Sequence, residues 1–221
     1  MERSLVIIKP DGTARRRVSA LVLQALIGRG YKLVAFREMK VSESLAKMHY
    51  AVHREKPFFH WLVSFICSAP VIAMIFEADG VIQGVRNALG ATFVQKAAPD
   101  SLRGKYGIWA GINIAHASDA PETAASELAL WASEGGLVED PGAEASARAY
   151  IDQYIDGDID YTMKLREVVK NAIEDRDASR KTLRLLKDLF GKDAAGIHQK
   201  DTNALAKAVF DFVREEVEKS K

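Results

Sequence analysis

His116 is the residue whose surroundings point most clearly to chemistry. It follows the short apolar run 112–115. It precedes a segment in which Asp119 and Glu122 fit a capping box and Pro121 suits the first turn of a helix. Free backbone N–H groups at a helix N-terminus attract phosphate. An imidazole in that place could therefore act as a nucleophile or a base in phosphate chemistry.

Phosphoryl transfer also needs cations, because catalysis is mainly positioning and neutralisation of charge. Arg86 on a predicted helix and Arg103 in a long loop are candidates, since arginine suits bidentate phosphate contacts. Lys9 is a third candidate, at the end of an apolar strand beside a Pro-Asp-Gly turn. The remaining histidines are expected to be surface or packing residues: His49, His53, His60 and His198.

One acidic segment partly fits a calcium-binding loop. Asp156, Asp158, Asp160 and Glu167 occupy positions 1, 3, 5 and 12 of that pattern. The glycine required at the sixth position is replaced by Tyr161, which is unsuited to the sharp turn. We therefore expect a solvated acidic turn before a helix and no calcium site.

The composition is that of a globular protein and excludes several classes. The 221 residues include 31 Lys+Arg and 30 Asp+Glu, so the formal net charge is +1 and no overall field favours nucleic acid or anionic lipid. A single cysteine, Cys67, excludes an internal disulfide. The apolar runs are too short for a signal peptide or a membrane span. We expect a cytoplasmic protein with no nucleic-acid or membrane partner.

The elements that must position these residues alternate between strands and helices. Apolar runs predict strands at 5–8, 31–39, 71–76 and 112–115, with helices at 18–27, 42–52, 58–67, 81–89 and 121–131 and a long loop at 90–109. This order favours an α+β, ferredoxin-like (split βαβ) α/β sandwich with a four-stranded antiparallel sheet. Neither glycine-rich phosphate loop of the doubly wound folds occurs in the sequence.

Breaker residues near position 140 predict a boundary between two parts of the chain. We place one domain at 1–140 and a helical C-terminal extension at 141–221. The extension contains three amphipathic patterns, each with one apolar face. Such helices are marginal alone, so the extension must pack on the core or on a neighbouring subunit.

Seven ordered segments resemble the nucleoside diphosphate kinase family over roughly residues 2–140. They read Ile8-Lys9-Pro10-Asp11-Gly12, His49-Tyr50, Lys56-Pro57-Phe58-Phe59, Leu89-Gly90-Ala91-Thr92, Leu102-Arg103-Gly104, Asn113-Ile114-Ala115-His116-Ala117-Ser118-Asp119 and Glu127-Leu128-Ala129-Leu130-Trp131. The resemblance implies a ping-pong reaction between nucleoside triphosphates and diphosphates, including ATP, GTP, ADP and deoxy forms. It also implies Mg²⁺ held mainly by the nucleotide phosphates, with no protein metal site, and a homo-oligomer.

The resemblance assigns a role to each matching position. His116 would be the phosphorylated nucleophile, Glu127 would orient its ring, and Ser118 would support them. The remaining assignments cover the pocket: Arg86, Thr92 and Arg103 for the phosphates, Lys9 and Asn113 for the ribose and nearby phosphate oxygens, Tyr50 beside His116, and Phe58, Leu62 and Ala110 around the base.

Three departures from the family pattern accompany the match. Ala117 replaces a glycine, an extra residue lies in the segment 14–17, and Phe93-Val94 replaces Asn-Pro. If the family glycine needs a backbone angle closed to alanine, His116 could be displaced. A nucleotide-binding regulatory protein with little turnover is therefore the alternative to an active kinase. A ferredoxin-like nucleic-acid platform is disfavoured by the near-zero net charge.

Overall fold

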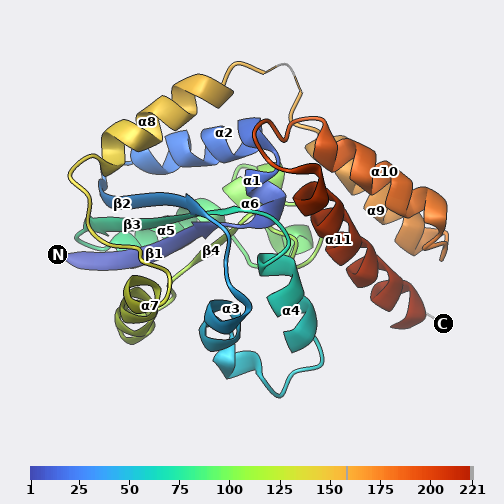
Figure 1. Cartoon of the computed structure of the whole chain (residues 1–221), viewed down its shortest axis with the longest axis horizontal. Coiled ribbons are helices and arrows are strands. Elements are labelled where there is room, and N and C mark those ends of the chain that lie inside the picture. Colours follow the sequence, from blue (N-terminus) through green and yellow to red (C-terminus); the bar gives the residue numbers. More distant parts are fainter. Residues whose placement is uncertain (158, 220–221) are drawn as a thin grey trace.

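The computed structural model describes residues 1–157 and 159–219, and its centre is a four-stranded antiparallel sheet (Figure 1). The strands are β1 (Glu2–Ile8), β2 (Lys32–Met39), β3 (Val71–Ala78) and β4 (Ala115–Ala117), in the order β2-β3-β1-β4. The expected α+β sandwich is confirmed.

The sheet has a core on each face because its strands alternate between the two sides. Val6, Ile8 and Met74 pack against α2 (Arg16–Ile27), α5 (Val81–Leu89) and α8 (Ala143–Tyr154). Leu5, Ile7 and Ala73 pack against α3 (Glu43–His49), α4 (Phe59–Ile66) and α7 (Pro121–Ser133). Shorter elements are α1 (Pro10–Thr13), α6 (Leu102–Tyr106) and the 3₁₀ turns Ala51–His53 and Val94–Lys96.

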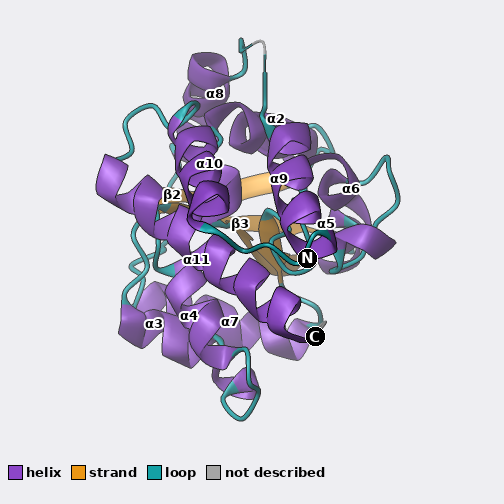
Figure 2. Ribbon diagram, turned by 90° about the vertical axis from the view of Figure 1, so that its right-hand side faces the viewer, coloured by secondary structure: helices purple, strands orange, loops and turns teal. Residues whose placement is uncertain are grey.

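The C-terminal extension consists of helices, as expected, but they join two different cores. Buried residues of α8 belong to the same apolar cluster as the sheet. The other three helices, α9 (Thr162–Glu174), α10 (Arg180–Gly191) and α11 (Gln199–Lys219), share a separate cluster with α4 (Figures 1 and 2). The boundary near residue 140 stays a prediction, since α8 packs as part of the sandwich.

The segment with the extra residue attaches the extension. Arg15 donates to the Thr162 hydroxyl at 2.7 Å and to the Tyr106 carbonyl at 2.9 Å. Arg16 is buried and donates two hydrogen bonds to the Glu38 carboxylate, at 2.9 and 3.0 Å. Its Nη1 also donates to the Tyr150 hydroxyl at 3.0 Å, and its Nε donates to the Ala195 carbonyl at 2.8 Å. The backbone N–H of Arg17 donates to Asp193 at 3.0 Å.

The fourth strand lies later in the chain than the apolar run 112–115 predicts. Ile114 has φ of 67°, a left-handed conformation that is costly for a β-branched residue and ends the extended run. Its N–H donates to the buried Asp11 carboxylate at 2.9 Å, and its carbonyl accepts from the Lys9 N–H at 2.7 Å. These tertiary contacts override strand propensity, and β4 starts at Ala115.

Three smaller expectations are also corrected. The segment after Lys9 forms a helical turn, α1, where a simple turn was predicted. The N-cap of α7 is Ala120 and makes no side-chain hydrogen bond, so the Asp119 capping box is wrong, although Pro121 does begin the helix. The loop 90–109 contains α6.

The acidic segment before α9 acts as a turn within the described residues. Asp160 accepts a hydrogen bond from the Thr162 N–H at 2.8 Å, which satisfies a free donor at the start of α9. Tyr161 does adopt a left-handed conformation, with φ of 58°, contrary to the argument from its size. Asp158 lies outside the described residues. No helix in the described part of the chain is long and apolar enough to span a membrane.

We expect Arg16→Ala to lower the free energy of unfolding by about 2–4 kcal/mol, because it removes a buried cation and leaves Glu38 and Tyr150 without it. Urea denaturation measures this change. Arg148→Ala is the matched control, since Arg148 pairs with Glu144 on the surface of α8 and should cost less than about 0.5 kcal/mol. Equal losses in the two variants would contradict the assignment of Arg16 as the attachment point.

Candidate active site

His116 lies on β4 and is held by a carboxylate from α7. Its register partner is Ile7 on β1. The His116 Nε2 atom lies 2.7 Å from Glu127 Oε1, and the other Glu127 oxygen accepts from the Ser118 hydroxyl at 2.6 Å. Ser118 is itself fixed, because its oxygen accepts from the Leu5 N–H at 3.1 Å. His116, Glu127 and Ser118 are thus joined directly, as the sequence predicts.

The carboxylate determines which nitrogen of His116 is free. Burial raises the pKa of Glu127, but hydrogen bonds from His116 and Ser118 outweigh that effect and hold its pKa below the usual 4.5. An ionised Glu127 accepts the Nε2–H of a neutral imidazole. The lone pair of Nδ1 is then available as a nucleophile in a ring that is 26 % exposed.

His49 is a site residue that the sequence placed only among surface or packing residues. Its side chain is 2 % exposed, and its ring centroid lies 4.6 Å from that of His116 at an interplanar angle of 82°. Trp131 donates its Nε1–H to His49 Nδ1 at 3.3 Å. Burial, with His116 adding to it, lowers the pKa of His49 to about 3. His49 is therefore an uncharged ring that lines one side of His116. The sequence signal that could have identified it as a site residue was its place in the His49-Tyr50 segment.

Tyr50 reaches the site through His49. The Tyr50 ring lies 4.7 Å from the His49 ring, and the residue is buried at the end of α3. Burial raises the pKa of Tyr50, so its hydroxyl stays protonated near neutral pH. The structure thus places Tyr50 in contact with His49.

Two predicted cations are buried beside the His116 strand. Arg103 donates to the Ala115 carbonyl at 2.8 Å and to the Gly90 carbonyl at 2.7 Å. Its Nε is buried without a hydrogen-bond partner among the described residues. Lys9 donates to the Gly111 carbonyl at 2.8 Å, and burial lowers its pKa to about 8. Both groups keep part of their positive charge free for an anion.

The other predicted phosphate and ribose residues differ in burial: Arg86 and Thr92 are exposed, whereas Asn113 is buried. Arg86 on α5 is exposed. Burial lowers the pKa of Arg103 to about 10, and the nearby positive charge of Arg86 adds to this effect. Thr92 is exposed, and its carbonyl accepts from the Asn113 amide at 2.6 Å. The Asn113 side-chain oxygen is buried without a partner among the described residues, which marks it as a free acceptor.

The predicted base-binding residues lie on two different segments. Phe58 precedes α4 and is 44 % exposed, and Leu62 is half-buried on the same helix. Ala110 lies on the other segment, in the loop after α6, and has φ of 45°. Gln95 accepts a hydrogen bond from the Ala110 N–H at 3.1 Å, which fixes this loop. A ring with nearly half its surface exposed is suited to stack on a planar ligand.

The donor set does not form a magnesium site on the protein. His49, His116 and Glu127 offer atoms within 4.8 Å of one another. Both Glu127 oxygens already accept hydrogen bonds, and His49 Nδ1 accepts from Trp131. Mg²⁺ prefers oxygen ligands in octahedral geometry. These residues therefore suit an imidazole nucleophile better than a magnesium site.

Comparisons with known proteins agree with this geometry. A sequence model of the nucleoside diphosphate kinase family matches residues 2–136. A nucleoside diphosphate kinase of Picosynechococcus is 47% identical over 146 residues, which are 66% of this chain and 97% of the relative. One from Synechococcus is 49% identical over 138 residues, 62% of this chain and 92% of the relative.

Solved structures give the same result. The nucleoside diphosphate kinase of Halobacterium salinarum, in complex with CDP, is 42% identical with a TM-score of 0.57, covering 66% of this chain and 97% of that one. The Aquifex aeolicus enzyme is 37% identical with a TM-score of 0.55, covering 58% and 93%. Since the family match spans more than half of the sequence and includes the His116 strand and its Glu127 partner, the chain belongs to the nucleoside diphosphate kinase family.

Proposed function

We propose that this protein is an active nucleoside diphosphate kinase that transfers the γ-phosphate of a nucleoside triphosphate to a nucleoside diphosphate through a phosphohistidine on His116. The observation that carries the proposal is the 2.7 Å contact between His116 Nε2 and Glu127 Oε1. It fixes the tautomer that leaves Nδ1 free, and Glu127 stabilises the positive charge that forms on the ring.

The reaction consists of two matched halves. In the first, the Nδ1 lone pair forms a bond to the γ-phosphorus while the bond from that phosphorus to the β–γ bridging oxygen breaks, and a nucleoside diphosphate leaves. In the second, the terminal oxygen of another diphosphate attacks the same phosphorus and the N–P bond breaks. The Nε2 proton stays in its hydrogen bond with Glu127 throughout.

Buried cations would supply most of the charge stabilisation. Arg103 and Lys9 lie beside the His116 strand, and Arg86 adds a second guanidinium. Charges held in a partly buried site act more strongly than charges in water. Thr92 and Asn113 would orient the phosphate and ribose oxygens, and a Mg²⁺ ion bound with the nucleotide would neutralise part of the phosphate charge.

The base site favours broad substrate use. Phe58 would stack on the base, with Leu62 and Ala110 as apolar neighbours. Stacking on an aromatic ring is tolerant of base identity. We therefore propose ATP, GTP, ADP and their deoxy forms as substrates.

The alternative of a regulatory protein with little turnover loses its main motivation. Ala117 lies in β4, paired with Val6, and is not among the described residues with positive φ. Alanine at this position therefore creates no backbone strain that would displace His116. Assembly into a homo-oligomer and a cytoplasmic location, consistent with a single cysteine, stay part of the proposal.

Mixing the protein with Mg-ATP labelled at the γ-phosphate should give an acid-labile, base-stable phosphoenzyme, because a phosphorylated imidazole hydrolyses in acid. His116→Ala should take up no label. His198→Ala is the control, since His198 is exposed in the extension and its loss should leave labelling unchanged. A wild-type protein that takes up no phosphate would refute the proposed mechanism.

Removing the guanidinium of Arg86 or of Arg103 should reduce kcat/KM by on the order of a hundredfold, because each group would contribute a few kcal/mol of charge stabilisation in the transition state. Arg86→Ala and Arg103→Ala test this in a coupled transfer assay, and Arg103→Lys separates lost charge from lost packing. Arg29→Ala is the matched control, because Arg29 is exposed after α2. Near-normal rates for both alanine variants would show that the phosphate site is misassigned.

The rate should also fall in alkaline solution because of Lys9. Burial lowers the pKa of this lysine to about 8, so the free enzyme loses the Lys9 charge as the pH rises through that value. We expect kcat/KM to decline above about pH 8, and to decline only at higher pH in Lys9→Arg, which keeps its charge. Identical pH profiles for the two proteins would exclude Lys9 as the titrating group.

A further inference from the structure

The two walls proposed for the nucleotide pocket rest against the C-terminal extension. One wall is α4, with Phe58 and Leu62, and the other is α6 with the loop that follows it, which carry Arg103 and Ala110. Figure 2 shows α11 running across α4. The residues behind both walls belong to the same apolar cluster as α9, α10 and α11.

The α4 wall is held by α11. Trp61, the neighbour of Leu62, donates its Nε1–H to the Ala208 carbonyl at 2.9 Å, and this hydrogen bond is buried. The ring of Phe212 lies 5.0 Å from that of Trp61, which stacks on Phe65 at 5.0 Å. The base-side wall is therefore fixed by both a hydrogen bond and aromatic packing.

The α6 wall is held by α9 through Arg166. The Arg166 side chain donates from Nε to the Gly107 carbonyl and from Nη2 to the Gly104 carbonyl, both at 2.7 Å. These carbonyls lie at the C-terminal end of α6, where helix carbonyls lack partners in the helix and the dipole favours a cation. Arg166 thus caps, from the extension, the short helix that carries Arg103.

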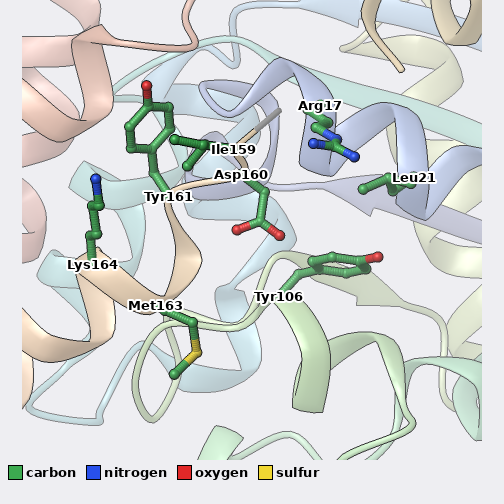
Figure 3. Close-up of a pocket in the computed structure, with 8 residues that line it drawn as sticks. All are labelled: Arg17, Leu21, Tyr106, Ile159, Asp160, Tyr161, Met163 and Lys164. Carbon is green, nitrogen blue, oxygen red and sulfur yellow. The ribbon is translucent and has the colours of Figure 1, made fainter. Parts of the chain in front are cut away.

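The side of α9 that faces α2 borders an open pocket. A cavity of about 540 Å³ opens there, between Arg17 and Leu21 of α2, Tyr106 of α6 and the start of α9 (Figure 3). Hydrogen bonds join α9 to α6 beside this cavity: Arg166 donates to carbonyls at the C-terminal end of α6, and Arg15 bridges the Thr162 hydroxyl and the Tyr106 carbonyl.

The two contacts come from one packed unit. Leu165 and Val169 of α9 and Leu205, Val209 and Val213 of α11 are fully buried in a single cluster. A fixed α9–α11 pair fixes the separation of the two walls. The walls need such support, because α4 has eight residues and α6 has five, and short helices are marginal without packing.

We propose that the extension is an internal brace for the nucleotide pocket. Arg166 of α9, and Trp61 of α4 through its contact with α11, are positioning residues that hold Arg103 and Phe58 at the spacing a nucleotide requires. The inference rests on the proposed function, since it takes these two residues as ligands of the phosphates and the base. A pocket whose walls are already ordered binds with less loss of conformational freedom.

The test uses the full chain with Arg166→Met, which keeps the length of the side chain without its donors, and Trp61→Phe, which removes the indole N–H. We expect the Kd for ADP, measured by calorimetry, and the KM for nucleotides to rise about tenfold in each variant. The kcat at saturating nucleotide should stay within about threefold of wild type, because bound nucleotide restores the spacing. Arg166→Lys should recover part of the affinity by replacing one donor.

Arg184→Met is the matched control, because Arg184 is exposed on α10. Unchanged ADP affinity in Arg166→Met and Trp61→Phe, within twofold of this control, would overturn the brace. A fall in kcat with KM unchanged, or no recovery with Arg166→Lys, would also overturn it. Calorimetry needs no turnover, so a wild type that binds ADP but forms no phosphoenzyme would refute the kinase mechanism while the brace is still judged by affinity.

Discussion

The hydrogen bond from the Ile114 N–H to the buried Asp11 carboxylate is the constraint on which the active site depends. A left-handed conformation costs a β-branched residue on the order of 1–3 kcal/mol, so it persists only where the surroundings impose it. Here Asp11 holds the N–H of Ile114 and Lys9 holds its carbonyl. The bend between them ends the loop, starts β4 and brings His116 opposite Glu127.

Two histidines in contact have different tasks because their surroundings differ. His116 is partly exposed, and its Nε2 contacts the ionised Glu127 carboxylate, which leaves Nδ1 free to react. His49 is enclosed and accepts a hydrogen bond from Trp131, and its low pKa keeps it neutral. A protonated imidazole at the His49 position would repel the positive charge that forms on His116 in the proposed phosphoryl transfer. The buried neutral ring of His49 lines the site without repelling that charge.

The C-terminal extension is attached through both polar and apolar contacts. Arg15 and Arg16 anchor it to the sandwich, while Trp61 and Phe65 of α4 enter the apolar cluster that its last three helices share. The same Arg15 donates to the backbone carbonyl of Asp11 at 2.7 Å. Asp11 holds the strained Ile114, and Arg15 contacts both Asp11 and the extension. The bend at the active site and the attachment of the extension are therefore linked through Asp11 and Arg15.

The sequence by itself determined the order of strands and helices, the α+β class and the family, because alternation, periodicity and short motifs are local properties. It also placed His116, Glu127 and Ser118 together through the family resemblance, and it identified the extension as amphipathic helices. Only the tertiary structure decided that Ile114 bends, that His49 is buried beside His116, and that α8 joins the sheet while α9–α11 share a second core with α4. Those outcomes depend on partners such as Arg15 and Thr162, which are 147 positions apart. An apolar face shows that a helix must be covered, but not which surface covers it, and the fold alone settles that.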